Sequence, residues 1–403
     1  MNESQILFLK ALKHALNHDK FKDCTASSDV WKSVFHIAEQ QNVLPLIYEA
    51  AHKCTHGEYI SHIQKKVRHQ VMIQTQKTQE FLTVYQKLRE NNLTPLVVKG
   101  LICRNCYPVP DLRPSSDEDV LISSEQFDSC HQILLSSGLV TDCADLNSAY
   151  EVSYRSKGTL YLELHKSLFP VSSAYGQMND LFKDAIQNKK EIMIEGTSVY
   201  TMNETDHLFY LIVHALKHFM HSGFGIRQVC DVSMFVNRYA SDIDWKRFDI
   251  LCDQVHGQHF ASAIFKIGMK YLTLDETKLP ELFRNCNVDE SFMLEDLLDS
   301  GIYGKSSLSR LHSSAMTLEA VLSDKQGKKG KINLMSSLFP DASVMQSRYA
   351  YVRKTKLLLP VAWIFRFIQY GKQTLTSRNN SALKSIQIGT QRIELLRKYK
   401  IIE

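Results

Sequence analysis

Hydrophobic residues recur at helical spacing through the first ninety positions of the chain. ILFLKALKHAL, residues 6–16, places apolar side chains every three or four positions, which is typical of an amphipathic helix. A second helix is predicted to start near Ser28 and Asp29, because both residue types cap helix N-termini. Residues 59–90 contain no glycine or proline and carry one apolar stripe, which predicts a single long helix. We therefore expect residues 1–92 to form an N-terminal helical segment.

Short apolar runs alternate with helical ones after residue 92. LTPLVVKG and EDVLIS predict buried strands, TLYLELHKSL predicts a third strand by its clean alternation, and EIMIEGTSVYTMN predicts a hairpin that turns at Glu195 and Gly196. LICRNCY predicts a short helix, and SSEQFDSCHQILLSSG predicts a longer one with Ser123 or Ser124 as its N-cap. Interleaved strands and helices over residues 93–202 predict an α/β module.

Helical patterns return after residue 202 and continue toward the C-terminus. ETDHLFYLIVHALKHFMH and QVCDVSMFVNRYA predict two successive helices, and we expect residues 203–403 to form a helical domain. One segment interrupts this pattern. SDKQGKKGKIN, residues 323–333, is polar and rich in glycine and lysine, which predicts a mobile loop.

The composition supports a globular, helix-rich protein. The 403 residues are 44% hydrophobic and 23% charged, and the scarcity of glycine (16) and proline (9) disfavours a sandwich or barrel with many turns. No signal peptide pattern is visible, and the longest apolar run, residues 357–365, is shorter than the roughly 20 residues that span a bilayer. Nine scattered cysteines predict reduced thiols in a cytoplasmic protein.

The net charge of +5 is concentrated in the C-terminal tail. From Met345 onward twelve lysines and arginines oppose two glutamates, so the tail carries +10 and the remainder about −5. Such a tail can bind RNA, a nucleotide or an anionic membrane surface. A solvated helical tail with a basic face is the alternative, and the pattern favours it.

Three consecutive carboxylates stand directly before the second predicted strand. Side chains two apart on a strand share a face, so Asp117 and Asp119 point one way and Glu118 points the other, where we expect a structural role. On the third predicted strand Glu163 and His165 share a face, and Glu163 can approach the aspartates if the two strands pair. Converging carboxylates repel one another, and a bound cation resolves that conflict.

This pattern suits the transfer of a phosphoryl or nucleotidyl group. Mg²⁺ prefers oxygen ligands, and two such ions about 4 Å apart stabilise the attacking and leaving oxygens of an in-line displacement. Lys99 and Gly100 precede a helix whose N-terminal amides can bind phosphate, and Arg113 can hold a phosphate bidentately. The structural alternatives are a surface position for Lys99 and the solvated face of an edge strand for Glu163 and His165.

The first C-terminal helix is rich in histidine. His214 and His218 share a face at i and i+4, but the glutamate of a metalloprotease motif is absent, which disfavours zinc. We expect His214 and Lys217 or His218 to face a cleft and touch phosphate or base, with a packed helix of hydrogen-bonded histidines as the alternative. Asp231 can pair with Arg227, four residues earlier, or orient a substrate hydroxyl.

The order of these features resembles a known family. VVKGLICRNCYPVPDLRPSSDEDVLI, residues 97–122, is similar to the signature of the uncharacterised bacterial nucleotidyltransferase family within the polymerase-β-like superfamily. That signature has a Lys-Gly turn, a short helix, a Tyr-Pro, an Arg and an Asp-x-Asp strand. YLELHKSL resembles the family's acidic-x-His strand, and LFYLIVHALKH with RQVCDVSMFV resembles its helical segment.

The resemblance implies an α+β fold, with a small mixed-sheet nucleotidyltransferase core (93–202) between N-terminal helices and a C-terminal helical domain. It implies Asp117 and Asp119 as metal ligands, Glu163 as the third carboxylate, and transfer of a nucleoside monophosphate from an NTP to a hydroxyl acceptor, with pyrophosphate leaving. One departure matters: the wider superfamily has Gly-Ser at the turn where this chain has Lys99 and Gly100. The departure leaves phosphoryl transfer and a binding-only role as alternatives.

The expected site therefore has two groups of residues. The catalytic and metal-binding residues are Asp117, Asp119 and Glu163, and the nucleotide- or phosphate-binding residues are Lys99, Gly100, Arg113, His165, His214, Lys217 and Asp231. The main hypothesis is a cytoplasmic nucleotidyltransferase that uses Mg²⁺, with two ions bound, and an NTP such as ATP. The alternatives are an inactive protein of the same fold that binds nucleic acid or a partner through the basic tail, and a toxin-like transferase that modifies tRNA.

Overall fold

The computed structural model describes most of the chain. The described residues are 1–143, 146, 150–171, 175–221, 223–300, 313, 316, 317, 320, 321, 345, 355, 358–365 and 382–402. The predicted loop at residues 323–333 lies outside them. Seven of the twelve basic residues of the tail, between positions 348 and 378, also lie outside them.

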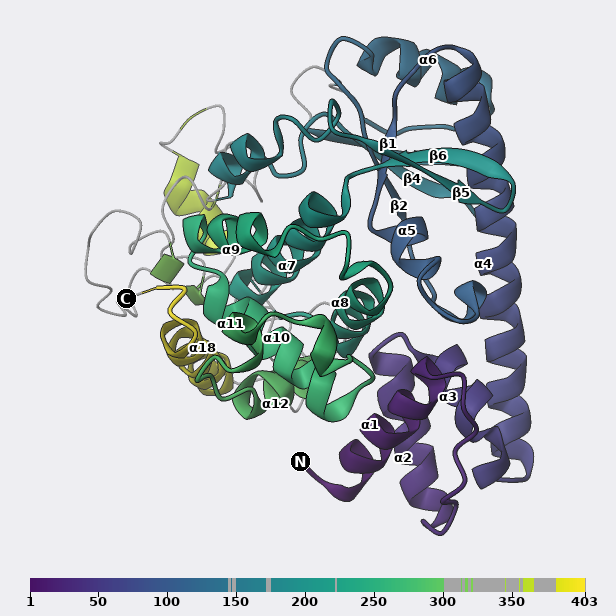
Figure 1. The fold of residues 1–403 in the computed structure, drawn as a ribbon, viewed down its shortest axis with the longest axis vertical. Helices are drawn as coiled ribbons and strands as arrows, with labels where there is room; N and C mark the ends of the chain where they lie inside the picture. Colours follow the sequence, from purple (N-terminus) through teal and green to yellow (C-terminus); the bar gives the residue numbers. More distant parts are fainter. Residues whose placement is uncertain are drawn as a thin grey trace.

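The N-terminal segment is helical, as predicted. Its helices are α1 (Glu3–Leu16), α2 (Ser28–Gln40), α3 (Leu44–Ala51) and α4 (Glu58–Glu90), with a short 3₁₀ turn at His52–Cys54. The 33 residues of α4 confirm the single long helix predicted from the absence of glycine and proline. Figure 1 shows α4 running along one side of the molecule, from α1–α3 at one end to the sheet at the other.

A six-stranded mixed sheet forms the centre of the fold. Its strands are β1 (Leu96–Val98), β2 (Glu118–Leu121), β3 (Glu151–Arg155), β4 (Tyr161–His165), β5 (Lys190–Ile194) and β6 (Thr197–Thr201). The order is β3-β4-β2-β1-β6-β5, with β1–β6 and β2–β4 parallel and the other pairs antiparallel. The three predicted strands and the hairpin are confirmed, whereas β3 was not predicted.

The hairpin turn of this module follows the prediction, whereas the start of its longer helix does not. Glu195 and Gly196, with φ of 47° and 81°, form the tight turn of the predicted hairpin. The helix α6 (Phe127–Ser136) begins later than expected, because residue Gln126 occupies the N-cap position without a side-chain capping bond. The predicted Ser123 or Ser124 cap is therefore wrong. The Gln126 amide instead closes a turn onto the Ser123 carbonyl, and its side chain accepts bonds from Thr94.

The C-terminal part is helical, as expected. Its described helices are α7 (Glu204–His221), α8 (Ile226–Tyr239), α9 (Trp245–Gln254), α10 (Gln258–Tyr271), α11 (Glu281–Arg284), α12 (Ser291–Ser300) and α18 (Ala382–Lys398). A short 3₁₀ turn lies at Glu276–Lys278, and two others lie earlier in the chain, at Pro110–Leu112 and Gly176–Phe182. The short helix α5 (Gly100–Arg104) contacts β1, β2 and α8 and so joins the sheet to this part. Most buried hydrophobic residues of the described part form one core from Leu7 to Ile402, and Met345 and Ala362 form a small separate cluster. The proposed boundaries at 92 and 202 stay a prediction.

The described end of the basic tail packs into the fold. The Arg392 side chain is 2% exposed and donates hydrogen bonds to the carbonyls of Phe219 and His221, at the C-terminus of α7. The Tyr399 hydroxyl donates to the Asp289 carbonyl and accepts the Met293 amide. Arg392 therefore has a structural role, and an anionic partner for the rest of the tail stays a prediction.

Two cysteines correct the expectation that all nine are reduced. Cys24 and Cys54 form a disulfide across 30 residues of sequence, and the other seven cysteines are free. The two meet because the segment after α1 runs beside the end of α3, where the Phe21 amide bonds to the Ala50 carbonyl. In the described part of the chain, every helix is too short or too polar to cross a membrane. The expected cytoplasmic location stays a prediction.

Candidate active site

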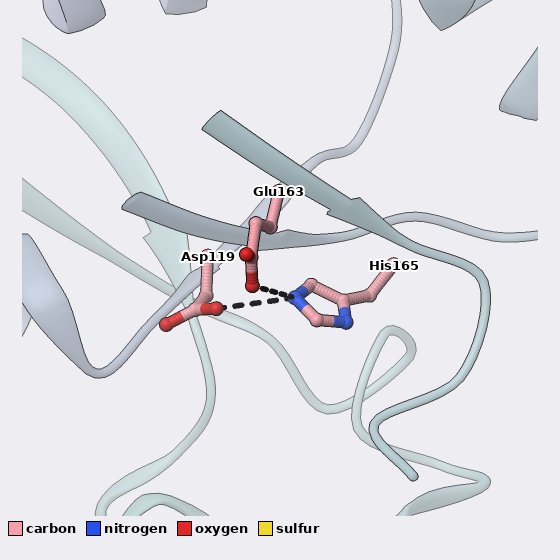
Figure 2. Close-up of side chains that lie close together, drawn as sticks. All are labelled: Asp119, Glu163 and His165. Atoms are coloured by element: carbon pink, nitrogen blue, oxygen red, sulfur yellow. Dashed lines mark hydrogen bonds and ion pairs between the residues drawn. The ribbon is translucent and has the colours of Figure 1, made fainter. Parts of the chain in front are cut away.

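The parallel pairing of β2 with β4 brings two predicted site residues together. The register places Asp119 opposite Glu163, on two central strands of the sheet. His165 lies two residues further along β4, on the same face as Glu163. Figure 2 shows the three side chains converging on one point above the sheet. The expectation that strand pairing brings Glu163 close is confirmed for Asp119.

His165 stands within a ring of carboxylates. Its Nε2 atom is 3.1 Å from Asp119 Oδ1 and 3.8 Å from Glu163 Oε2, while its Nδ1 atom is 3.5 Å from Glu151 Oε2. The His165 side chain is 6% exposed and that of Asp119 is 7% exposed. Glu151 belongs to β3, the strand that the sequence did not predict, and it pairs directly with His165 in the antiparallel register.

Asp117 lies at the edge of this cluster. It is half-buried and precedes the first residue of β2, and its charge contributes to the repulsion felt by Glu163. The donor atoms of Asp119, Glu163 and His165 all lie within 4.8 Å of one another, and Asp117 is not part of that set. The structure thus brings together two of the three predicted carboxylates with a histidine, and metal binding by Asp117 stays a prediction.

Burial and neighbouring charges shift the pKa values of Glu163 and Asp119 in opposite directions. Burial raises the pKa of Glu163 to about 7, and repulsion from Asp119, Asp117 and Glu151 adds to the rise. Burial also opposes ionisation of Asp119, but the Lys99 ammonium and the His165 ring outweigh it and lower the pKa of Asp119 to about 2. The pKa of His165 is raised, because its contact with Asp119 outweighs its burial.

The arrangement fits a divalent cation. Asp119 Oδ2 is buried and has no hydrogen-bond donor among the described residues. A buried carboxylate oxygen without a donor costs free energy, which a cation in contact with it would offset. Two carboxylates and an imidazole within 4.8 Å supply enough ligand atoms for one ion, with further positions left for water or phosphate oxygens.

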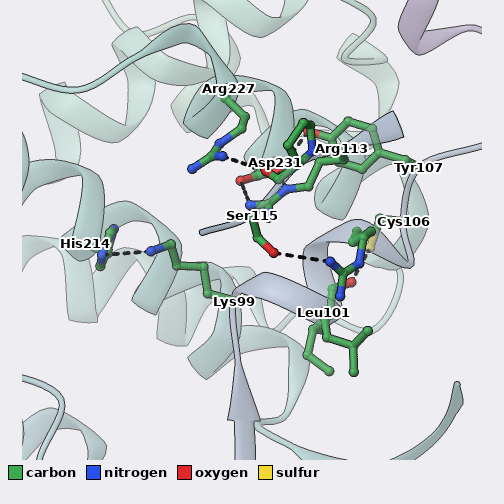
Figure 3. A network of polar contacts seen from close by, with 12 residues as sticks. Lys99, Leu101, Cys106, Tyr107, Arg113, Ser115, His214, Arg227 and Asp231 are labelled. Carbon is green, nitrogen blue, oxygen red and sulfur yellow. Dashed lines mark hydrogen bonds and ion pairs between the residues drawn. The ribbon is translucent and has the colours of Figure 1, made fainter. Parts of the chain in front are cut away.

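Basic groups line the side of the cluster nearest α7. Lys99 Nζ lies 3.8 Å from Asp119 Oδ2 and 3.2 Å from His214 Nε2 (Figure 3). Burial, and next the Lys99 charge, lower the pKa of His214 well below its usual value, so the neutral ring accepts a hydrogen bond from the Lys99 ammonium. The His218 ring packs edge-on against His214, with the ring centroids 4.6 Å apart. Burial lowers the pKa of Lys217, and the nearby Glu151, Asp119 and Glu163 carboxylates oppose part of that shift. Their contact with a nucleotide stays a prediction.

The Lys-Gly turn is built around Glu118. Lys99 adopts a φ of 62° and donates its amide to His207 Nε2, and the Leu101 amide donates to Glu118 Oε2. A Cβ on Gly100 would stand 2.4 Å from that same Glu118 oxygen, so only glycine lets the carboxylate approach. Glu118 is fully buried and pairs with Arg104 at 3.0 Å, which confirms its structural role. Phosphate binding at Gly100 stays a prediction, and the Leu101 amide is already engaged.

Arg113 and Asp231 are partners in the structure. Arg113 Nε and Nη2 donate to the two Asp231 oxygens at 2.9 and 2.5 Å, and the Tyr107 hydroxyl donates to Oδ1 at 2.8 Å (Figure 3). Both charged side chains are almost fully buried. The bidentate pair engages both charged groups, and the phosphate contact expected of Arg113 and the substrate contact expected of Asp231 stay predictions. Arg227, the expected partner of Asp231, donates to the Pro114 carbonyl at 2.6 Å.

Sequence reasoning missed the residues that hold the loop before Asp117. Lys77 Nζ donates to the carbonyls of Ser115 and Ser116 at 2.6 and 3.0 Å, and Gln74 Oε1 accepts the Ser115 amide at 2.8 Å. Both side chains come from α4 and are buried. One signal was available, because Gln74 continues the helical spacing of the buried apolar stripe. A polar residue in such a stripe indicates a buried partner.

One comparison with known proteins, the family model, agrees with the sequence pattern. A family model described as uncharacterised nucleotidyltransferase matches residues 27–271, which contain all ten predicted site residues. A crystal structure of an antigenic nucleotidyltransferase-like protein from Paracoccidioides brasiliensis is similar at 15% identity, over 51% of this chain and 96% of that chain, with a TM-score of 0.31. No match was found among the curated proteins.

Proposed function

This chain belongs to the uncharacterised nucleotidyltransferase family, and we propose that it transfers a nucleoside monophosphate from an NTP to a hydroxyl-bearing acceptor. The observation that carries the proposal is the pairing of β2 with β4, which sets Asp119 opposite Glu163. Paired carboxylates beside the Lys99 ammonium offer both a cation site and a positive charge for phosphate within one small region.

Each residue has a distinct task in this proposal. A Mg²⁺ ion or pair of ions held by Asp117, Asp119 and Glu163 would stabilise the attacking and leaving oxygens. Lys99 and Lys217 present positive charge to the phosphates, and neutral His214 positions the Lys99 ammonium through their 3.2 Å contact. Glu163 accepts the proton of the acceptor hydroxyl. The hydroxyl oxygen then bonds to the α-phosphorus, the bond to the β-phosphate oxygen breaks, and pyrophosphate leaves with its electron pair.

Thermal unfolding with nucleotides tests the proposal. Wild type, Asp119→Asn and Asp128→Asn are melted with ATP, GTP, CTP or UTP, each with and without Mg²⁺. Asp128 is an exposed aspartate on α6 and serves as the matched control. A ligand at 100 times its Kd adds about 2.7 kcal/mol to the free energy of unfolding. We expect a Mg²⁺-dependent shift with one NTP in wild type and Asp128→Asn that disappears in Asp119→Asn.

Two results would count against the proposal. The absence of a shift with every nucleotide in wild type would favour a binding protein of the same fold. A shift that survives in Asp119→Asn would separate nucleotide binding from the paired carboxylates. Transfer itself is then measured as pyrophosphate release with hydroxyl-bearing acceptors.

A further inference from the structure

Asp119, Glu163 and His165 form a donor set of mixed chemistry. Two carboxylate oxygens and one imidazole nitrogen lie within 4.8 Å of one another, and His165 Nε2 points into the space between the two carboxylates (Figure 2). Nε2 is 3.1 Å from Asp119 Oδ1 and 3.8 Å from Glu163 Oε2. A cation placed between the carboxylates would therefore meet a nitrogen ligand as well as oxygens.

A third carboxylate, that of Glu151, lies on the other side of the imidazole ring. Glu151 Oε2 lies 3.5 Å from Nδ1, on the opposite side of the ring from Asp119 and Glu163. Metal-binding histidines almost always donate their other N–H to a carboxylate, carbonyl or water, which fixes the tautomer and leaves the first nitrogen free to bind. Glu151 is the cross-strand partner of His165, so the register of β3 with β4 places its carboxylate beside the ring.

The buried atoms of the cluster point to an ion as well. Asp119 Oδ2 and His165 Nδ1 are both buried without a hydrogen-bond partner among the described residues. The Lys99 Nζ atom lies 3.8 Å from Asp119 Oδ2, which is too far for a hydrogen bond. A turn of the Asp119 carboxylate that brings Oδ2 to an ion beside Nε2 would satisfy that oxygen, and Nδ1 needs only a slight approach to Glu151 Oε2, 3.5 Å away.

We infer that Asp119, Glu163 and His165 form a mixed nitrogen–oxygen site that takes Mn²⁺ in preference to Mg²⁺. Mg²⁺ demands oxygen ligands in near-ideal octahedral geometry, whereas first-row transition cations accept imidazole readily. Two carboxylates with one imidazole match Mn²⁺, because it binds carboxylates as Mg²⁺ does and tolerates the nitrogen. Asp117 lies outside this set, and its contact with a second, Mg²⁺ ion belongs to the proposed function.

This inference deepens the proposed function and rests on it for the chemical role of the ion. The Mn²⁺ site would hold the ion nearer β4, and the reaction would then require two different cations. Binding of the ion itself is measured without any nucleotide, so the two ideas can fail separately.

The test measures metal binding directly. Protein stripped with EDTA and exchanged into metal-free buffer is titrated with Mn²⁺, and free Mn²⁺ is followed by electron paramagnetic resonance, with Mg²⁺ as competitor. We expect wild type to bind Mn²⁺ at least about tenfold more tightly than Mg²⁺, and His165→Gln to lose about tenfold or more in Mn²⁺ affinity. His62→Gln, which replaces an exposed histidine on α4, should bind as wild type does.

A second variant guards against a folding defect. Glu151→Gln keeps the imidazole and removes only the carboxylate behind it, and we expect about a tenfold loss of Mn²⁺ affinity with little change for Mg²⁺. Equal affinity of wild type for the two ions would overturn the inference. So would wild-type Mn²⁺ affinity in both folded variants.

The nucleotide melts keep the two proposals apart. His165-dependent Mn²⁺ binding without any nucleotide-induced shift would leave the metal site standing and remove the proposed transfer. A Mg²⁺-dependent nucleotide shift that His165→Gln leaves unchanged, with Mn²⁺ bound no better than Mg²⁺, would do the reverse.

Discussion

Glu163 and Asp119 face each other across two strands, yet their carboxyl groups ionise about five pH units apart. Lys99 and His165 favour the charged form of Asp119, whereas Glu163 is buried beside a charge of its own sign. One group is thus held as an anion while the other titrates near neutral pH. A pair separated in this way is characteristic of functional sites.

The raised pKa of Glu163 makes the stability of the metal-free protein depend on pH. The folded state binds this proton more tightly than the unfolded state, so the free energy of unfolding falls as pH rises from about 4.5 to about 7. Glu163→Gln removes that loss. Measured by urea unfolding in EDTA, we expect the variant to match wild type near pH 4 and to exceed it by at most about 3 kcal/mol near pH 8.

The opposite sign applies to Asp119. Its lowered pKa contributes stability above about pH 4, and this contribution is lost only as pH falls toward 2, outside the window of the comparison. An equal difference between Glu163→Gln and wild type at both pH values would show that Glu163 does not titrate in this range.

The buried pair of Arg113 and Asp231 gives a second prediction for single residues. Arg113→Met leaves Asp231 charged and buried, which we expect to cost about 3–5 kcal/mol in urea unfolding. The double variant with Asp231→Leu should recover part of that loss, because no unpaired charge remains. Arg155→Met breaks an exposed pair with Asp142 and should cost at most about 1 kcal/mol. A loss no larger than this control would mean that the buried pair contributes little.

Sequence reasoning located some side chains better than others, for a physical reason. The strand period of two residues predicted that Glu163 and His165 share a face, and the register of β2 with β4 places Asp119 beside them. Arg113 and Asp231 are 118 residues apart, and no local pattern reveals such a partner. The sequence therefore gave no sign that these two side chains form a buried ion pair.

At the scale of elements, α4 does more than cover the sheet. Lys77 and Gln74 reach from it to the backbone of the loop that carries Asp117. Glu80, one turn further, accepts the amides of Thr159 and Leu160 just before β4. One helix thus holds both chain segments that lead into the carboxylates.

Lys77→Met tests this positioning role. The change removes the donor from two partly buried carbonyl groups, each worth at most about 1–3 kcal/mol, and frees the loop before Asp117. We expect lower stability together with a weaker Mg²⁺-dependent nucleotide shift. Lys87→Met, at an exposed position of the same helix, should alter neither. A variant that is less stable but binds Mg²⁺ and nucleotide normally would make Lys77 purely structural.

The elements that the sequence revealed are those with a long or regular pattern. The apolar stripe of α4 is uninterrupted, and the β5–β6 hairpin turns at a Glu-Gly pair with positive φ. Both could be predicted without tertiary information. Helix α3 has eight residues and a proline in its first turn, and β3 has five residues of mixed polarity. Both depend on packing against neighbours, and neither carries a signal strong enough to predict alone.

At the scale of the molecule, Gln41 joins the N-terminal helices to the C-terminal part. Its fully buried side chain donates to the carbonyls of Leu297 and Leu298 and accepts the Ile226 amide at the start of α8. The sequence order predicted both helical parts. It gave no sign of their contact, because the partners lie 185 to 257 residues away.

Gln41→Leu should loosen this joint. Three buried backbone groups lose their partner, for which we expect a loss of about 2–4 kcal/mol. Hydrogen exchange should quicken at the Ile226 amide and along α12, with Gln40→Leu, an exposed neighbour, unchanged. Unaltered exchange at Ile226 would mean that apolar packing alone holds these parts together.

The rotational phase of α4 has a consequence for how this chain can change length over evolution. Near one end of the helix Tyr59 packs edge-to-face against Phe35, and further along Lys77 donates to the loop before Asp117. An insertion of one residue between them would turn the second face by about 100°, and would carry Lys77 away from its carbonyls. Seven inserted residues nearly restore the angle but lengthen the helix by about 10 Å. Insertions and deletions among relatives should therefore fall in the loops that flank this helix.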